Sequence, residues 1–202
     1  MSDDVKVKGT RERLVSTAAD LFGRQGLSAT GIKQILVGSE AQFSSLYHHF
    51  PGGKDQLAAE AIRIAGLGYQ QLVEEVWDGA GGLLASVRAV FDGAALVLEA
   101  TDYADACPIA IVALEVASTN EELRLATADV FASWNRALVS RFVGAGLDSS
   151  VAKELAVALV ALLEGAFILS RAAKSPEPMH VAGRTATAMV ASALPGEGTN
   201  SA

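Results

Sequence analysis

The chain has 202 residues, half of them hydrophobic, which is long enough for one ordinary hydrophobic core. Its single cysteine, Cys107, excludes an internal disulfide framework, and the first residues lack the pattern of a signal peptide, so we expect a cytoplasmic protein. The formal net charge is −7, but residues 1–60 hold 7 basic and 7 acidic side chains, and residues 61–202 hold 9 and 16. A neutral N-terminal part permits contact with phosphate without demonstrating it.

Hydrophobic residues recur with the period of an α-helix in almost every segment, prolines are rare, and no stretch alternates as a strand would. The sequence therefore predicts an all-α protein. Three helices are expected in the first fifty residues. The first follows Thr10 and ends at the glycines Gly23 and Gly26, the second has Thr30 as its N-cap, and the third covers about residues 42–49.

Longer helices are predicted for the remainder of the chain. A T-x-x-E capping box, Thr119 with Glu122, starts one of them, and glycines at 144 and 146 end it. The other expected helices are 54–77, 83–99, 108–116, 149–173 and 177–193, and residues 195–202 are expected to be a disordered tail.

The most apolar stretch, residues 155–169, is interrupted by Glu164 and Gly165. It is too short and too interrupted to span a bilayer, so we predict a buried helix and no membrane association.

The second and third helices, separated by about three residues, match a helix-turn-helix, whose second helix enters the major groove of DNA. Leu46 is expected to face inward with Phe50 behind it. Lys54, at the start of the next helix, is suited to a backbone phosphate because the free N–H groups there also attract anions. The outward-facing candidates for DNA contact are Gln42, Phe43, Ser44, Ser45, Tyr47 and His48.

Each candidate has a chemical reason. Ser44 and Ser45 can reach base edges or phosphates, and Gln42 can pair with adenine. Phe43 can pack against a thymine methyl group, and Tyr47 is a phosphate donor, as is His48. The alternative for this aromatic cluster is core packing, which we favour for Phe50 and leave open for His49.

Two stretches, "TGIKQI" at 30–35 and "SLYHHFPGGKDQL" at 45–57, resemble the N-terminal domain of the TetR family of transcriptional regulators. The form "HHFPGGK" is similar to the LmrA/YxaF-like subgroup, and "CPIAIVALE" at 107–115 resembles part of that subgroup's C-terminal domain. The resemblance implies a two-fold dimer, one recognition helix per subunit, a variable ligand pocket, and repression that is relieved by a small molecule.

The resemblance also implies site residues. Thr30 matches the family's helix cap, and Tyr47, His48 and Lys54 match its usual contacts to the DNA backbone, to which we add Lys33 in the same motif. The family usually has glycine where Glu40 stands, and often a lysine or threonine where Phe43 stands.

The second part of the chain is expected to bind the effector and to form the dimer. We predict a DNA-binding domain at 1–55 and a ligand-binding and dimerisation domain at 56–194, with helices 149–173 and 177–193 forming the homodimer interface. The shortage of charge inside this domain favours an apolar or aromatic effector. Candidate lining residues, for which core packing is the alternative, are Phe91, Tyr103, Cys107, Phe131 and Trp134.

The sequence thus predicts a dimeric DNA-binding repressor that responds to a ligand, with a palindromic double-stranded operator as partner. The alternative is a helical dimer that binds small molecules and has lost operator binding. No nucleophile elbow, phosphate-binding glycine loop or acid–base pair suggests an enzyme or a cofactor. A metal site is not expected, because adjacent histidines on a helix diverge by about 100°.

Overall fold

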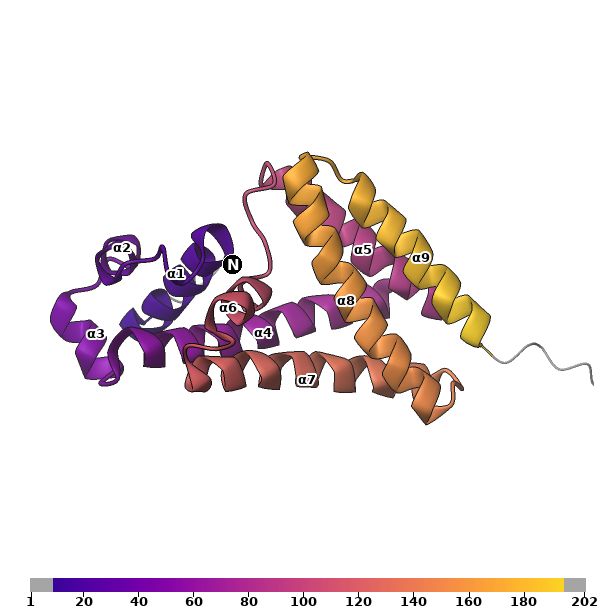
Figure 1. Cartoon of the computed structure of the whole chain (residues 1–202), viewed down its shortest axis with the longest axis horizontal. Coiled ribbons are helices and arrows are strands. Elements are labelled where there is room, and N and C mark those ends of the chain that lie inside the picture. Colours follow the sequence, from indigo (N-terminus) through magenta and orange to yellow (C-terminus); the bar gives the residue numbers. More distant parts are fainter. Residues whose placement is uncertain (1–8, 195–202) are drawn as a thin grey trace, which may run out of the picture. The chain divides into compact units, whose positions relative to one another are not determined.

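The computed structural model describes residues 9–194, which form helices and contain no strand, so the prediction of an all-α protein is confirmed. The expected tail at 195–202 lies outside the described residues. The helices, labelled in Figure 1, are α1 (Thr10–Gln25), α2 (Ile32–Gly38), α3 (Phe43–His49), α4 (Gly53–Gly79), α5 (Leu83–Ala100), α6 (Pro108–Val116), α7 (Glu121–Gly144), α8 (Ser149–Ala173) and α9 (Glu177–Ala193).

The described chain divides into two compact units. The first contains the residues up to Leu67 together with Pro108–Val130, and the second contains Gly68–Cys107 and the residues from Phe131 onward. Helices α4 and α7 each contribute to both units. The first unit extends beyond the predicted DNA-binding segment 1–55, because α6 packs against α1.

The core of the first unit follows from the helical spacing of its apolar residues. Leu14, Ala18 and Phe22 lie one turn apart on α1 and are fully buried. Helices α2 and α3 both contact α1 and bring Leu46 and Phe50 into the same interior. The predicted inward positions of these two residues are confirmed.

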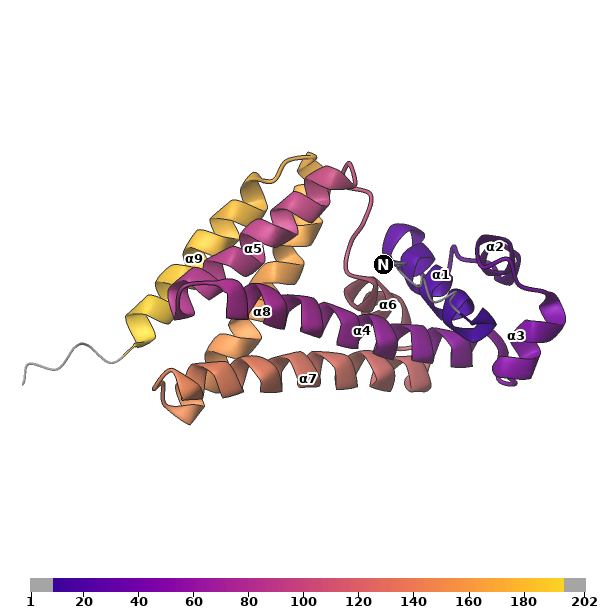
Figure 2. The ribbon, with the colours of Figure 1, turned by 180° about the vertical axis from the view of Figure 1, so that it is seen from behind.

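In the second unit, α5 and α9 run side by side, and α8 packs against both of them (Figures 1 and 2). Gly183 on α9 allows a close approach to α5, because a Cβ atom at this position would lie 2.8 Å from the Phe91 Cβ. The buried cluster of this unit includes Trp77, Phe91 and Phe142, and the Trp77 and Phe142 rings have their centroids 6.0 Å apart.

Two predicted helix starts were wrong by one residue. Gly31, not Thr30, is the N-cap of α2, and its N–H donates to the Gln34 side chain at 2.7 Å. Asn120, not Thr119, caps α7, and its Oδ1 accepts from the Leu123 N–H at 3.1 Å. In both cases the threonine hydroxyl instead donates to the carbonyl four residues earlier, which directs the side chain toward the preceding turn.

Helix α8 is the one described helix that is long and apolar enough to cross a membrane by length and composition, with a mean hydropathy of 1.9 in its most apolar window. Only 28% of that window is buried within the chain. The prediction of a buried helix therefore holds for one face only. The other face exposes Val157, Ile168 and Leu169.

Candidate DNA-binding helix and ligand cavity

The turn that joins α2 to α3 is built by backbone hydrogen bonds at the end of α2. The Ala41 N–H donates to the Leu36 carbonyl at 3.0 Å, and the Glu40 N–H donates to the Val37 carbonyl at 3.2 Å. This is the Schellman arrangement, in which the residue after the C-cap adopts a left-handed conformation. Glu40 occupies that place with φ +52°, although glycine is the residue best suited to it.

Glu40→Gly is therefore expected to raise the free energy of unfolding by about 1 kcal/mol, because it relieves a left-handed conformation at a side chain that is exposed. Urea denaturation of the two proteins measures the difference. Gly31→Ala in the neighbouring N-cap, which has φ −87°, is the control for changes at this site. A Glu40→Gly protein less stable than the parent would contradict the strain assigned to the turn.

Helix α3 presents one polar and aromatic face to solvent. Phe43 is 61% exposed and Tyr47 is 42% exposed, and their rings lie 5.0 Å apart by centroid. Ser44 and His48 are also exposed, as is the N-cap residue Gln42, while Ser45 is half-buried. The opposite side of the helix buries Leu46 completely, so this face is held rigidly outward.

The three other predicted DNA contacts lie in different environments. Lys33 is exposed on α2. Lys54 is half-buried at the start of α4, and its Nζ donates to the Leu27 carbonyl at 2.7 Å. Thr30 is only 1% exposed, its hydroxyl donates to the Gly26 carbonyl at 2.6 Å, and it also accepts from Gln25. The Thr30 hydroxyl is thus directed into the interior of the first unit, away from the exposed face of α3.

Glu115 on α6 holds the connection between α1 and α2, a role that the sequence analysis missed. Its carboxylate accepts from the Leu27 N–H at 3.1 Å, from the Ser28 N–H at 2.7 Å and from the Ser28 hydroxyl at 2.6 Å. The signal available in the sequence was that Glu115 is the single charged residue of α6. Together with Lys54, it fixes both backbone polar groups of Leu27.

The second unit contains a partly open cavity of about 250 Å³. Its walls come from α4, α5, α7 and α8 and from residues 105–107, and they are mostly apolar, as in sites for small organic molecules. The aromatic lining residues are Tyr69, Trp77, Phe91, Trp134 and Phe167.

Three of the predicted ligand-contacting residues, Phe91, Cys107 and Trp134, line this cavity. Tyr103 does not line it and is partly buried against the core of the unit. Phe131 does not either, although its ring packs edge-on against Trp134 at a centroid distance of 5.5 Å. The structure thus places three of the five predicted residues at the cavity.

Glu164 is a charged group in the cavity wall that the sequence did not single out as a site residue. It is half-buried on α8. Burial raises the pKa of its carboxyl to about 7, and a hydrogen bond with the Cys107 side chain lowers the pKa in part. A lone glutamate inside the apolar run 155–169 was the available signal.

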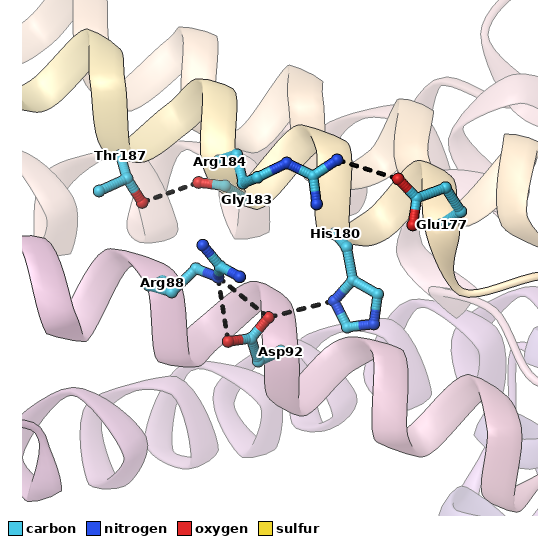
Figure 3. Close-up of polar contacts among 7 residues, drawn as sticks. All are labelled: Arg88, Asp92, Glu177, His180, Gly183, Arg184 and Thr187. Atoms are coloured by element: carbon cyan, nitrogen blue, oxygen red, sulfur yellow. Dashed lines mark hydrogen bonds and ion pairs between the residues drawn. The ribbon is translucent and has the colours of Figure 1, made fainter.

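A second polar cluster lies outside the cavity, between α5 and α9 (Figure 3). Arg88 Nε donates to both Asp92 oxygens at 3.2 and 3.1 Å, and Asp92 Oδ1 also contacts His180 Nδ1 at 3.2 Å. Arg184 donates to Glu177 at 2.9 Å along α9. These side chains are part-exposed, so each pair contributes about 1 kcal/mol or less and serves mainly to align the two helices.

Helix α3 exposes a polar face next to a tight turn, and a separate helical unit contains a cavity. These two features together are typical of helix-turn-helix regulators. Comparison with known proteins agrees with this class. Residues 14–61 match the family profile described as "Bacterial regulatory proteins, tetR family", and residues 84–185 match "Transcriptional regulator LmrA/YxaF-like, C-terminal domain". The chain belongs to the TetR family of transcriptional regulators, in its LmrA/YxaF-like group, and is not an enzyme.

Relatives match over most of their length. The HTH-type transcriptional regulator Rv0196 of Mycobacterium tuberculosis is 34% identical over 194 residues, which cover 94% of this chain and 98% of that protein. LmrA of Bacillus subtilis is 31% identical and is covered to 90%, with 84% of this chain aligned. A TetR regulatory protein from Rhodobacter sphaeroides shares the fold, with a TM-score of 0.79, 21% identity, and coverage of 89% and 98% of the two chains.

Proposed function

We propose that the protein is a cytoplasmic, ligand-responsive repressor whose homodimer binds a palindromic operator through α3 of each subunit. The observation that carries this proposal is the exposed face of α3, where Phe43, Ser44, Tyr47 and His48 project while Leu46 anchors the other side. Aromatic and small polar side chains on a rigid helix suit the major groove, where they meet methyl groups, base edges and phosphates.

Each proposed contact with DNA follows from the hydrogen-bonding groups, charge or apolar surface of the side chain. Gln42 and Ser44 read base edges, with Ser45 contributing from its half-buried position, and Phe43 packs on a thymine methyl group. Tyr47 and His48 donate to phosphates, as do the cations of Lys33 and Lys54. Lys54 first has to release the Leu27 carbonyl or share its three donor hydrogens with it.

We infer that the dimer forms through α8 and α9, within a ligand-binding and dimerisation domain at 56–194 that follows a DNA-binding domain at 1–55. The apolar residues Val157, Ile168 and Leu169 of α8 and Val181 of α9 are exposed in the single chain. Such a face is stabilised when a second copy covers it, and a two-fold axis then sets the spacing of the two α3 helices on DNA.

The effector is proposed to bind in the cavity and to act on α3 through α6. Residues 105–107 line the cavity, and α6 begins at the next residue, Pro108. At the other end of α6, Glu115 holds Leu27 and Ser28 just before α2. A ligand that shifts 105–107 therefore acts on a segment directly continuous with the support of the helix-turn-helix.

Selection of duplexes from a random DNA library by the purified protein at physiological salt tests the function. Recovery of a palindrome with half-sites about one helical turn apart, bound by a dimer, is the expected result. A folded dimer that enriches no sequence but binds small molecules would contradict operator binding and favour a ligand-binding protein that has lost it.

Lys33→Ala is expected to weaken binding to every duplex by several-fold, and to lower the slope of log affinity against log salt by about 0.9, because one phosphate contact is lost. Ser44→Ala is expected to change the preferred sequence instead. Fluorescence anisotropy over a salt series measures both. Lys153→Ala, an exposed lysine on α8, removes the same charge outside the helix-turn-helix and is expected to leave the slope unchanged. An unchanged slope in Lys33→Ala would remove that residue from the interface.

A further inference from the structure

The cavity wall combines aromatic surface with an excess of acidic over basic side chains. Its charged lining residues are Glu74 from α4, Asp105 from the segment before α6, Arg141 from α7 and Glu164 from α8, and α5 contributes none. The guanidinium of Arg141 forms an ion pair with Asp78, which does not line the cavity. Three carboxyl groups therefore face a single cation that already has a partner.

Glu164 is half-buried on α8, next to the partly buried apolar residues Leu162, Leu163 and Phe167. Its described polar contact is with the Cys107 side chain, and within residues 9–194 no lysine, arginine or histidine forms an ion pair with it. A carboxyl group in such surroundings is stable in two ways: it holds a proton, or it meets a cation. No described cationic side chain pairs with Glu164, so its ionised form lacks a counter-ion that a cationic ligand would supply.

The aromatic lining favours the same kind of ligand. Trp77, Phe91, Trp134 and Phe167 offer ring faces or edges to the body of an organic molecule. Ring faces also attract a cation, and the attraction is strongest where water is excluded. An anion would instead meet three carboxyl groups, and a neutral molecule would bury the Glu164 carboxylate without giving it a counter-ion.

We propose that the cavity takes an amphipathic organic cation, an amine or quaternary ammonium attached to an aromatic body, with the Glu164 carboxylate as its counter-ion. The proposal rests on the proposed function only in treating this molecule as the effector. Binding itself is independent of DNA, so the two ideas are tested separately.

The sharpest test compares two probes of nearly the same shape. (2-Naphthylmethyl)trimethylammonium carries a permanent positive charge, and 2-neopentylnaphthalene has carbon in place of the nitrogen. Quenching of Trp77 and Trp134 fluorescence reports binding of each to the full chain at pH 8 without DNA. We expect the cation to bind at least about tenfold more tightly than the neutral probe, because only the cation pairs with Glu164.

Glu164→Gln is expected to remove most of this preference and to leave binding of the neutral probe nearly unchanged. Glu154→Gln is the matched control, since it removes one negative charge from the same helix at an exposed position outside the cavity. Far-UV circular dichroism and thermal unfolding establish that each variant is folded. Equal affinity of the two probes for the parent protein, or an unchanged preference in Glu164→Gln, would overturn the proposal.

A pH series gives a second readout. Glu164 titrates near pH 7, so affinity for the permanent cation is expected to fall by about tenfold from pH 8 to pH 6, while affinity for the neutral probe stays constant. Cys107→Ser, which keeps a hydrogen-bond donor, excludes titration of the thiol as the cause. A flat profile for the cation in both proteins counts against Glu164 as the counter-ion.

Release of selected operator DNA by the cation is measured last. If the cation binds through Glu164 but leaves the DNA complex intact, the ligand assignment stands and the proposed effector role of the cavity fails. If neither probe binds, the ligand assignment is overturned, whereas operator binding by α3 is unaffected.

Discussion

Glu164→Gln is expected to raise the free energy of unfolding at pH 8 by about 3 kcal/mol and to remove most of its decline between pH 4.5 and pH 7. Burial raises the pKa of this carboxyl from 4.5 in its ordinary environment to about 7 in the folded protein. The folded state therefore binds the proton more tightly than the unfolded state, and stability falls as pH rises through this window. Each pKa unit corresponds to about 1.4 kcal/mol.

Urea denaturation at a fixed protein concentration between pH 4.5 and pH 8 measures this effect. Glu154→Gln, exposed on the same helix, is expected to follow the parent curve. Carboxyl groups whose pKa is lowered by hydrogen bonds, such as Asp78 beside Arg141 and Asp148 beside Ser150, act below about pH 4 and do not obscure the window. If Glu164→Gln and the parent lost stability in parallel up to pH 8, the titrating group would lie elsewhere.

Glu115→Ala is expected to lower the free energy of unfolding by about 2 kcal/mol and to weaken operator binding. The change removes an anionic acceptor from two backbone N–H groups and one hydroxyl, and Leu27 is buried, so its N–H gains little from water. The connection before α2 then loses the support that fixes the helix-turn-helix. Urea denaturation and anisotropy with the selected operator measure the two effects.

Two further variants distinguish the loss of the Glu115 hydrogen bonds from a general effect of removing a negative charge. Glu115→Gln keeps one acceptor oxygen and is expected to lose about half as much stability. Glu122→Ala removes an exposed glutamate near the start of α7 and is expected to change neither property. An unchanged free energy of unfolding in Glu115→Ala would show that the three hydrogen bonds make no net contribution to stability.

The sequence was sufficient to predict the helices and to predict which face of α3 points outward. Leu14, Ala18 and Phe22 are spaced by four residues, so they share one face wherever the helix packs. The same rule set Leu46 inward and its neighbours outward. These are local properties, because helical period and the glycines at helix ends depend on residues a few positions apart.

The N-caps of α2 and α7 were predicted incorrectly at Thr30 and Thr119, although capping also depends only on nearby residues. A threonine hydroxyl can cap the next helix or donate to the preceding turn, and both arrangements fit the same letters. In each case the hydroxyl donates to the carbonyl of the preceding turn, and the next residue, Gly31 or Asn120, is the N-cap.

Sequence alone determined that this is an all-α helix-turn-helix protein, because its signals repeat over short distances and match a known family. Only the tertiary structure decided that Glu115 tethers a loop 87 residues away, that Glu164 faces the cavity, and that Tyr103 and Phe131 do not. Helical spacing gives the direction of a side chain around its own axis. Which neighbour lies in that direction depends on how separate helices pack, and one sequence carries no local record of that packing.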